Sequence, residues 1–302
     1  MIVDQAVREA ELAFLNAPFT GEGWQLAIRN LAESTGSFLV QMCGGSPAPA
    51  QDFNIFSHDL GDPYGHLINP DLYGPQNWRL NSALQAPGSI QYEQHYATYR
   101  GARKCEYYDD ASSDLDLRFG CQSPLLFDNA GLIGLCLLRS GRDGPCTSEV
   151  LDAFSSVARQ AQRAVRVQLA LGQEQGETML EGVASSGEMT LLLDGQGRLV
   201  AMTEAAEILF DHPAGLRLDG LSVRLSDRAE DRSLQAAAGR LLASDGVWGP
   251  VLHEAVAGRC AAAPQGQWRL FLTRLPEGTD LLQVGPQLAL TLRPAAGTAR
   301  LA

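Results

Sequence analysis

Lysine is nearly absent from this 302-residue sequence, in which Lys104 is the only lysine among 23 basic residues. Acidic residues number 35, so the net charge at pH 7 is -12. A protein with this excess of negative charge is repelled by the phosphate backbone of nucleic acids. The composition therefore counts against direct binding of DNA or RNA by this chain.

Long apolar runs are also missing. No stretch approaches the roughly 20 apolar residues that a membrane-spanning helix needs. The N-terminus has acidic residues at Asp4, Glu9 and Glu11 in place of the basic and apolar regions of a signal peptide. We therefore expect a cytoplasmic protein that makes no membrane contact, in which thiols stay reduced. The cysteines are Cys43, Cys105, Cys121, Cys136, Cys146 and Cys260.

Motifs for catalysis and for metal binding are incomplete. Segment 44–48 resembles the G-x-S-x-G motif of serine hydrolases, but it ends in Ala48, and Pro47 has no N–H to stabilise an oxyanion. His253 begins a zinc-binding helix pattern in which Ala257 replaces the second histidine. We expect a protein that is not an enzyme and that binds neither a metal nor a cofactor.

The cysteines form no zinc motif, because the closest pair, Cys136 and Cys146, is ten residues apart. Cys121 and Cys136 lie in apolar segments, where a free cysteine behaves as a small core residue. Each cysteine is therefore interpreted as a core residue, with a redox-sensing thiol as the alternative.

Apolar patterns in the N-terminal half predict one α+β domain. Helical periodicity covers Asp4 to Asn16 and Gly21 to Thr35, and a strand-like segment follows. Two further apolar strands, 116–128 and 132–140, are joined by a short turn of the kind that closes antiparallel hairpins. We expect these elements to form a sensor domain over residues 1–147.

A long helix is predicted after Thr147, which is a suitable N-cap. Its apolar positions form a near-heptad series that favours pairing with a second copy of the chain, and packing on its own domain is the alternative. Gly172 and Gly176 indicate a segment that leaves the domain, so residues 148–184 are predicted to connect two domains. The expected dimer positions are Val150, Phe154, Val157, Ala161, Ala164 and Leu171.

The remaining pattern predicts a second domain over residues 185–294 and a tail over 295–302. The expected elements are two strands around Gly195–Gly197, a short helix capped by Thr203, one strand within 216–225, a helix from about Arg228 to Ser244 introduced by Ser226 or Asp227, and three strands. They fit one antiparallel sheet with helices on one face. The expected fold class is α+β, with two antiparallel-sheet sensor domains joined by a long helix.

The segment GEMTLLLDGQGRLVAMTEAAEILFDHPAGLRLDGLSVRL resembles the PAS-like domain of large LuxR-type helix-turn-helix regulators. In that pattern a hydrophobic strand, a D-x-x-G-x-v turn and a helix beginning N-x-A-A precede a GLrl strand. Thr203 stands here where the pattern has asparagine. Upstream, WQLAIRNLAESTGSFLVQM is similar to the opening helix and first strand of these regulators, and EVLDAFSSVARQAQRAVRVQLAL is similar to the helix that closes their GAF-like sensor domain.

The resemblance implies a bacterial sensor that controls transcription through a C-terminal helix-turn-helix domain. This chain ends in RPAAGTARLA directly after the last PAS-like strand. The domain is expected either to have been cut off or to have been lost, and DNA contact then depends on that missing domain.

Aromatic side chains with a polar end gather in the first domain and suit a small organic effector. The residues expected to bind it are Trp24, Phe38, Trp78, Tyr92, Tyr96, Tyr108 and Cys121. Core packing is the alternative for each of them. We expect a homodimeric sensor that binds a small molecule or a regulator protein. The alternative function is a free-standing adaptor or antagonist that binds a transcription regulator and needs no ligand.

Overall fold

Two units with separate sheets make up the chain in the computed structural model, and in the long central helix the boundary between them falls between Val167 and Gln168. The described residues are 4–45, 53–58, 77–86, 88–100, 113–128, 131–184, 189–207, 209–210, 216–243, 252–258, 268–275, 282 and 285–294. Among the helices of this described part, none has both the length and the apolar character needed to cross a membrane.

The first unit contains one sheet with helices on both faces. Its elements are α1 (Asp4–Asn16), η1 (Ala17–Phe19), α2 (Gly23–Thr35), β1 (Leu39–Gly45), β2 (Phe53–Phe56), α3 (Trp78–Gln85), α4 (Glu93–Arg100), β3 (Phe119–Asp128), β4 (Gly131–Arg139) and the first part of α6 (Ser148–Ala184). The strand order is β2-β1-β4-β3, and the pairs β1–β2 and β3–β4 are antiparallel. The β3–β4 hairpin confirms the prediction made from the two apolar strands.

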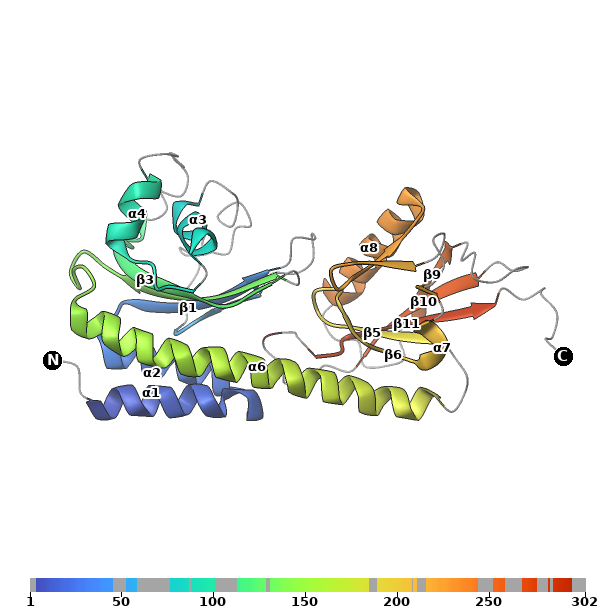
Figure 1. Cartoon of the computed structure of the whole chain (residues 1–302), viewed down its shortest axis with the longest axis horizontal. Helices are drawn as coiled ribbons and strands as arrows, with labels where there is room; N and C mark the ends of the chain where they lie inside the picture. The colour runs from blue at the N-terminus through green and yellow to red at the C-terminus, as the bar shows by residue number, and fades with distance from the viewer. Residues whose placement is uncertain are drawn as a thin grey trace. The chain divides into compact units, whose positions relative to one another are not determined.

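Helices cover this sheet in two layers. In Figure 1, α1, α2 and the first half of α6 lie on one side of the sheet, and α3 and α4 lie on the other. Phe14 of α1 and Trp24 of α2 pack edge to face, with ring centres 6.3 Å apart. Both side chains are fully buried, so the layer of α1 and α2 has an apolar core of its own.

The helix predicted after Thr147 is α6, and the Thr147 hydroxyl accepts a hydrogen bond from the Val150 amide, as expected of an N-cap. The expected dimer positions Val150, Phe154, Val157, Ala161 and Ala164 are all buried within the chain, and Leu171 is half-buried. Packing on its own domain, the alternative weighed for this face, accounts for their burial. The homodimer, with these positions at its interface, stays a prediction.

Gly176 marks a close contact inside the second unit, to which residues 168–184 of α6 belong. A Cβ atom at this position would lie 3.1 Å from Cγ1 of Val200 and 3.2 Å from Cβ of Ala201, both on β6 (Leu199–Met202). The missing side chain lets the helix backbone approach the strand. The second half of α6 thus packs within the second unit, where the sequence pattern predicted a separate connecting segment.

The second unit has a five-stranded antiparallel sheet in the order β6-β5-β11-β10-β9. Besides β6, its elements are β5 (Met189–Leu193), α7 (Glu204–Glu207), β7 (Leu216–Asp219), β8 (Ser222–Leu225), α8 (Arg228–Ala243), β9 (Leu252–Gly258), β10 (Trp268–Arg274) and β11 (Leu288–Pro294). Together with the first unit, it confirms the expected α+β class with antiparallel sheets.

The segment 216–225, which was predicted to be one strand, is instead the antiparallel hairpin β7–β8. Gly220, between the two strands, has a φ angle of 62°. Glycine adopts this left-handed conformation without the steric cost that other residues meet. The chain therefore reverses at a residue that the strand prediction treated as part of a continuous run.

Side-chain hydrogen bonds fix two element boundaries in this unit. Oδ1 of Asp227 accepts hydrogen bonds from the amides of Ala229 and Glu230, so Asp227 caps α8 as one of the two predicted alternatives. These bonds lower the pKa of the Asp227 carboxyl below its ordinary value. The Thr203 hydroxyl, expected to cap α7, accepts a hydrogen bond from the amide of Thr190 in β5.

Gly239 is a position where α8 tolerates a larger residue, because a Cβ atom there would meet nothing within 4 Å. Glycine inside a helix costs about 0.5–1 kcal/mol relative to alanine. We expect Gly239→Ala to raise the free energy of unfolding of the second unit by about this amount, measured by urea denaturation. A lower value in the variant would contradict the open space around this residue.

A candidate ligand cavity in the first unit

A cavity of about 80 Å³ lies between α3 and the sheet of the first unit. Asn77, Arg79, Leu80 and Ala83, at the start of α3 and along it, form its helix side. Sites for small molecules are concave and mainly apolar, with a few polar groups that orient the ligand. The volume suits a ligand of a few non-hydrogen atoms.

The sheet presents one face to this cavity. In β4, Leu132, Gly134, Cys136 and Leu138 line the cavity, and their spacing of two matches the alternation of side chains along a strand. The intervening residues Ile133, Leu135 and Leu137 are buried on the opposite face. Further lining residues spaced by two are Gln41 and Cys43 in β1 and Gln122 and Pro124 in β3.

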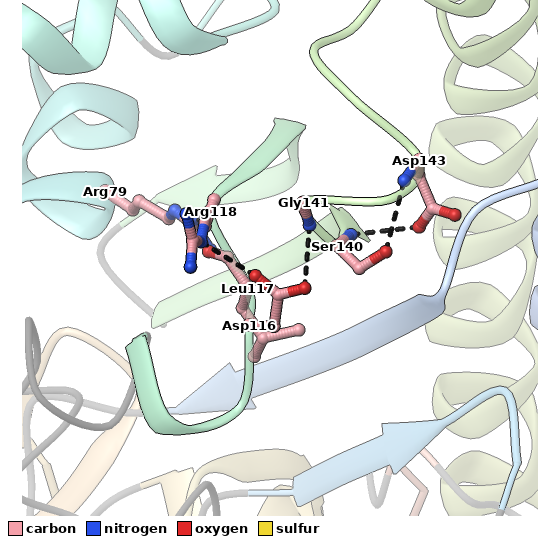
Figure 2. A network of polar contacts seen from close by, with 7 residues as sticks. All are labelled: Arg79, Asp116, Leu117, Arg118, Ser140, Gly141 and Asp143. Atoms are coloured by element: carbon pink, nitrogen blue, oxygen red, sulfur yellow. Dashed lines mark hydrogen bonds and ion pairs between the residues drawn. The ribbon is translucent and has the colours of Figure 1, made fainter.

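Arg79 brings a positive charge to the cavity wall. Its Nη2 donates a hydrogen bond to the carbonyl oxygen of Leu117 over 2.7 Å (Figure 2). The guanidinium carbon lies 5.0 Å from the ring centre of Trp78 and 5.6 Å from that of Tyr96, within the range of cation–π attraction. The Gln122 amide donates to the main-chain oxygen of Arg79, so the sheet and α3 are joined beside the cavity.

A short loop holds the Leu117 carbonyl in place. Asp116 has a φ of 53°, a left-handed conformation that aspartate tolerates better than most residues. Its Oδ1 lies 2.8 Å from Nε of Arg118, and its Oδ2 accepts a hydrogen bond from the Gly141 amide (Figure 2). The loop before β3 is thereby tied to the loop after β4. This network positions the group to which Arg79 is bound.

Four of the cysteines lie in the described part of the first unit, and they form two pairs. A hydrogen bond from the Cys43 thiol lowers the pKa of Cys136, and the charge of Arg79 acts in the same direction against the effect of burial. Burial raises the pKa of Cys121 well above its ordinary value, and a hydrogen bond with Cys146 adds to the increase. Because the thiolate is the nucleophilic form, we expect the two pairs to differ in reactivity.

Two of the expected ligand residues support the cavity wall instead of lining it. Trp78 and Tyr96 are buried, with ring centres 5.2 Å apart, and both lie beside the Arg79 guanidinium. The Tyr96 hydroxyl donates a hydrogen bond to the main-chain oxygen of Gln91. These aromatic rings hold the charged residue that lines the cavity.

The other expected ligand residues lie elsewhere. Trp24 belongs to the core between α1 and α2, and Phe38 packs edge to face with His58. Tyr92 packs against the ring of His95, and Cys121 is buried beside Cys146. Tyr108 lies outside the described residues.

The cavity residues that sequence reasoning missed carry a signal that was available. Gln41 and Gln122 are long polar side chains inside apolar strands. Gln41 shares its strand face with Cys43, and Gln122 shares its face with Pro124. Polar groups on a buried strand face need partners and so indicate a site. Arg79 gave no such signal, because its hydrogen-bond partners Leu117 and Gln122 come from distant parts of the sequence.

The described residues do not bring together three or more His, Cys, Asp or Glu side chains in a way that could hold a metal ion. The side chain of His253, where a metal motif was considered, lies outside the described residues. The cavity chemistry in the described part of the chain is that of Arg79, the amides and the thiols.

No protein-family model and no curated protein matches this chain. The chain is similar in structure to CepR2 of Burkholderia cenocepacia, which is described as an N-acylhomoserine lactone dependent LuxR family transcription factor. The similarity covers 55% of this chain and 97% of that chain, with 13% identity and a TM-score of 0.43. SdiA of Escherichia coli is similar over 58% of this chain and 79% of its own, with 15% identity and a TM-score of 0.40.

A bacteriophytochrome, RpBphP3 from R. palustris, matches 97% of this chain and 63% of its own, with 12% identity and a TM-score of 0.42. Identities and TM-scores this low do not assign the chain to a family.

Proposed function

We propose that this chain is a signal-sensing regulatory protein whose effector is a small molecule bound in the cavity between α3 and the sheet. The observation that carries the proposal is the placement of one buried arginine and a few amide groups in the wall of a mainly apolar cavity. Such an arrangement favours a ligand with an apolar body and an oxygen that accepts a hydrogen bond. The LuxR-type resemblance extends the proposal to control of transcription through a helix-turn-helix domain.

A direct contact links the cavity to α6. Nε2 of Gln162 in α6 donates a hydrogen bond to the carbonyl oxygen of Pro124, a cavity residue, over 3.0 Å. A ligand changes the state of a protein only if it binds one arrangement better than the other. A ligand that shifts Pro124 therefore alters the position of the strand on the long helix.

A second contact reaches the start of the same helix. Oε1 of Glu93 in α4 accepts hydrogen bonds from the amides of Gly120 in β3 and Cys146, directly before the Thr147 cap. The Glu93 carboxylate thus connects α4, on the cavity side of the sheet, to the segment directly before α6. We infer that α6 is the output element of the first unit.

We expect Gly134→Val to abolish ligand binding. Gly134 lines the cavity, and a Cβ atom there meets nothing within 4 Å, so the side chain of valine starts in open space and takes up cavity volume. The test is a thermal-shift screen of small aliphatic ketones, esters and alcohols. The wild-type melting temperature rises with the binding compound, whereas that of Gly134→Val does not change.

The matched control is Gly88→Val. Gly88 is exposed in the same unit, does not line the cavity, and also has free space around its Cα. This variant keeps the wild-type ligand shift. The proposal fails if no compound stabilises the wild type and no ligand copurifies, or if Gly134→Val binds as well as Gly88→Val.

A second function, that of an adaptor for a regulator protein, is favoured by a different surface. Leu12, Phe19 and Leu26, on α1, η1 and α2, are between 50% and 64% exposed. The three elements contact one another, and large exposed apolar side chains on them are candidate contacts for a protein partner. A regulator that copurifies in stoichiometric amount while the cavity is empty supports this second function.

A further inference from the structure

The cavity contains two cysteines whose thiols are in contact. Cys43 on β1 and Cys136 on β4 come from strands that are neighbours in the sheet, and both line the cavity. A hydrogen bond joins the two thiols, and each residue is half-buried. A disulfide spans Cα atoms about 4.4–6.8 Å apart, and neighbouring strands lie about 4.7–4.9 Å apart, so two cysteines on adjacent strands that face one cavity are suitably placed for a disulfide.

The surroundings of Cys136 differ from those of an ordinary core cysteine. Its Sγ donates to Oε1 of Gln122 over 3.7 Å, and the guanidinium of Arg79 belongs to the same cavity wall. A nearby positive charge favours the thiolate, and the thiolate is the form that attacks oxidants. Cys136 therefore has an activating charge on one side and a second thiol on the other.

We propose that Cys43 and Cys136 are an oxidation site, at which a hydroperoxide small enough to enter the cavity converts the two thiols into a reversible disulfide. This inference goes beyond the proposed function, because it needs no organic effector. It assigns a chemical use to two residues that a sensor of apolar ligands does not require.

The chemistry balances in two steps. The Cys136 thiolate attacks one oxygen of hydrogen peroxide and breaks the O–O bond, which gives Cys136 sulfenic acid and hydroxide, and a proton turns the hydroxide into water. The sulfur of Cys43 then attacks the sulfenic sulfur, forms the S–S bond and releases a second water. The peroxide gains the two electrons that the thiols lose, and a dithiol reductant reverses the change.

The second thiol pair is a built-in comparison. Cys121 is fully buried in β3 and contacts Cys146, but burial raises the pKa of Cys121 and so disfavours its thiolate. Cys121 is not among the described residues that line the cavity. We expect the pair Cys43 and Cys136 to react at least about tenfold faster than the pair Cys121 and Cys146, since rate follows thiolate content and access.

The test treats the reduced full chain with hydrogen peroxide at low molar excess and follows it by intact-mass and peptide mass spectrometry. The expected product has lost two hydrogen atoms and contains a peptide link between Cys43 and Cys136. In Cys43→Ser, Cys136 stops at the sulfenic acid, which dimedone traps. In Cys136→Ser, Cys43 stays reduced.

The control is the double variant Cys121→Ser/Cys146→Ser, which keeps the disulfide and its rate. Circular dichroism before and after treatment shows that the protein stays folded. A link through any other cysteine, including Cys105 or Cys260, overturns the inference. So does the absence of reaction at Cys136. Formation of the Cys43–Cys136 disulfide in wild-type protein that no compound of the thermal-shift screen stabilises would support this inference while the proposed function fails.

Discussion

Replacing Asp194 with alanine is expected to lower the free energy of unfolding of the second unit by about 3–5 kcal/mol, the usual cost of breaking a buried ion pair. Oδ2 of Asp194 lies 2.6 Å from Nε of Arg198, and the two side chains are only 3% and 6% exposed. Oδ1 accepts hydrogen bonds from the amides of Gln196 and Arg198. The alanine variant removes all of these bonds and leaves the arginine charge buried.

The partner variant Arg198→Ala is expected to depend on pH. Burial raises the pKa of Asp194 above its ordinary value, and the charge and hydrogen bonds of Arg198 oppose this rise. Without Arg198 the pKa in the folded state rises further, so the folded protein binds a proton more readily than the unfolded chain. Protonation of Asp194 therefore adds to the free energy of unfolding at low pH, and this contribution is lost as the pH rises through the raised pKa of Asp194. Arg198→Ala is therefore less destabilising in acid than at neutral pH, whereas Asp194→Ala lacks this dependence.

Urea denaturation at several pH values measures both effects. Glu207→Ala, which removes an exposed carboxylate at the end of α7, is the control and should stay within about 0.5 kcal/mol of the wild type. If Asp194→Ala behaves like this control, the ion pair does not hold the turn. If Arg198→Ala shows no pH dependence, the effect of burial on the pKa of Asp194 is smaller than inferred.

In the turn that contains Asp194 and Arg198, the sequence predicted the backbone reversal but not the burial of its side chains. The residues Gly195–Gly197 correctly predicted a tight reversal between two strands, and Gly197 has the left-handed φ of 72° that such a turn needs. Local composition says nothing about burial, however, and Gln196 is only 3% exposed. Burial depends on which distant segments cover a turn, and a single sequence does not reveal them.

The elements with long-range periodicity were predicted best. Helix α1 has the predicted bounds, and α2 begins two residues later than expected. The dimer series on α6 has the spacing of a coiled coil, but the same spacing suits a helix that packs on its own sheet. Periodicity identifies the apolar face of a helix but does not determine which surface packs against that face.

The cavity was predicted only at the level of its domain. Aromatic residues were expected to line it, because they are large and have polar ends, yet Trp24 and Phe38 serve the core and Trp78 supports Arg79. The lining of β4 follows from strand alternation once the face that α3 covers is known. That face is a tertiary property, so the sequence predicted the strand but not the residues that line this cavity.

The second large effect is expected for Gly120→Ala in β3, which should lower the free energy of unfolding of the first unit by about 3 kcal/mol. Gly120 has a φ of 146°, and a Cβ atom there would lie 2.1 Å from the carbonyl oxygen of Leu137 on the paired strand. The obstacle is main chain, so it cannot move aside as a flexible side chain does. To relieve the clash, strands β3 and β4 must separate at this position. The Gly120 amide also donates a hydrogen bond to Glu93 there, so this bond is put at risk as well.

Gly134→Ala in β4 provides the matched control, because it makes the same chemical change in the same hairpin where a Cβ atom meets nothing within 4 Å. Alanine reduces the conformational entropy of the unfolded chain relative to glycine, so this variant should be neutral or more stable by up to about 1 kcal/mol. Thermal and urea unfolding of both variants measure the difference. Equal stabilities would mean that the first unit accommodates a side chain at Gly120. A large difference locates the constraint in the backbone contact with Leu137, since the loss of glycine as such is common to both variants.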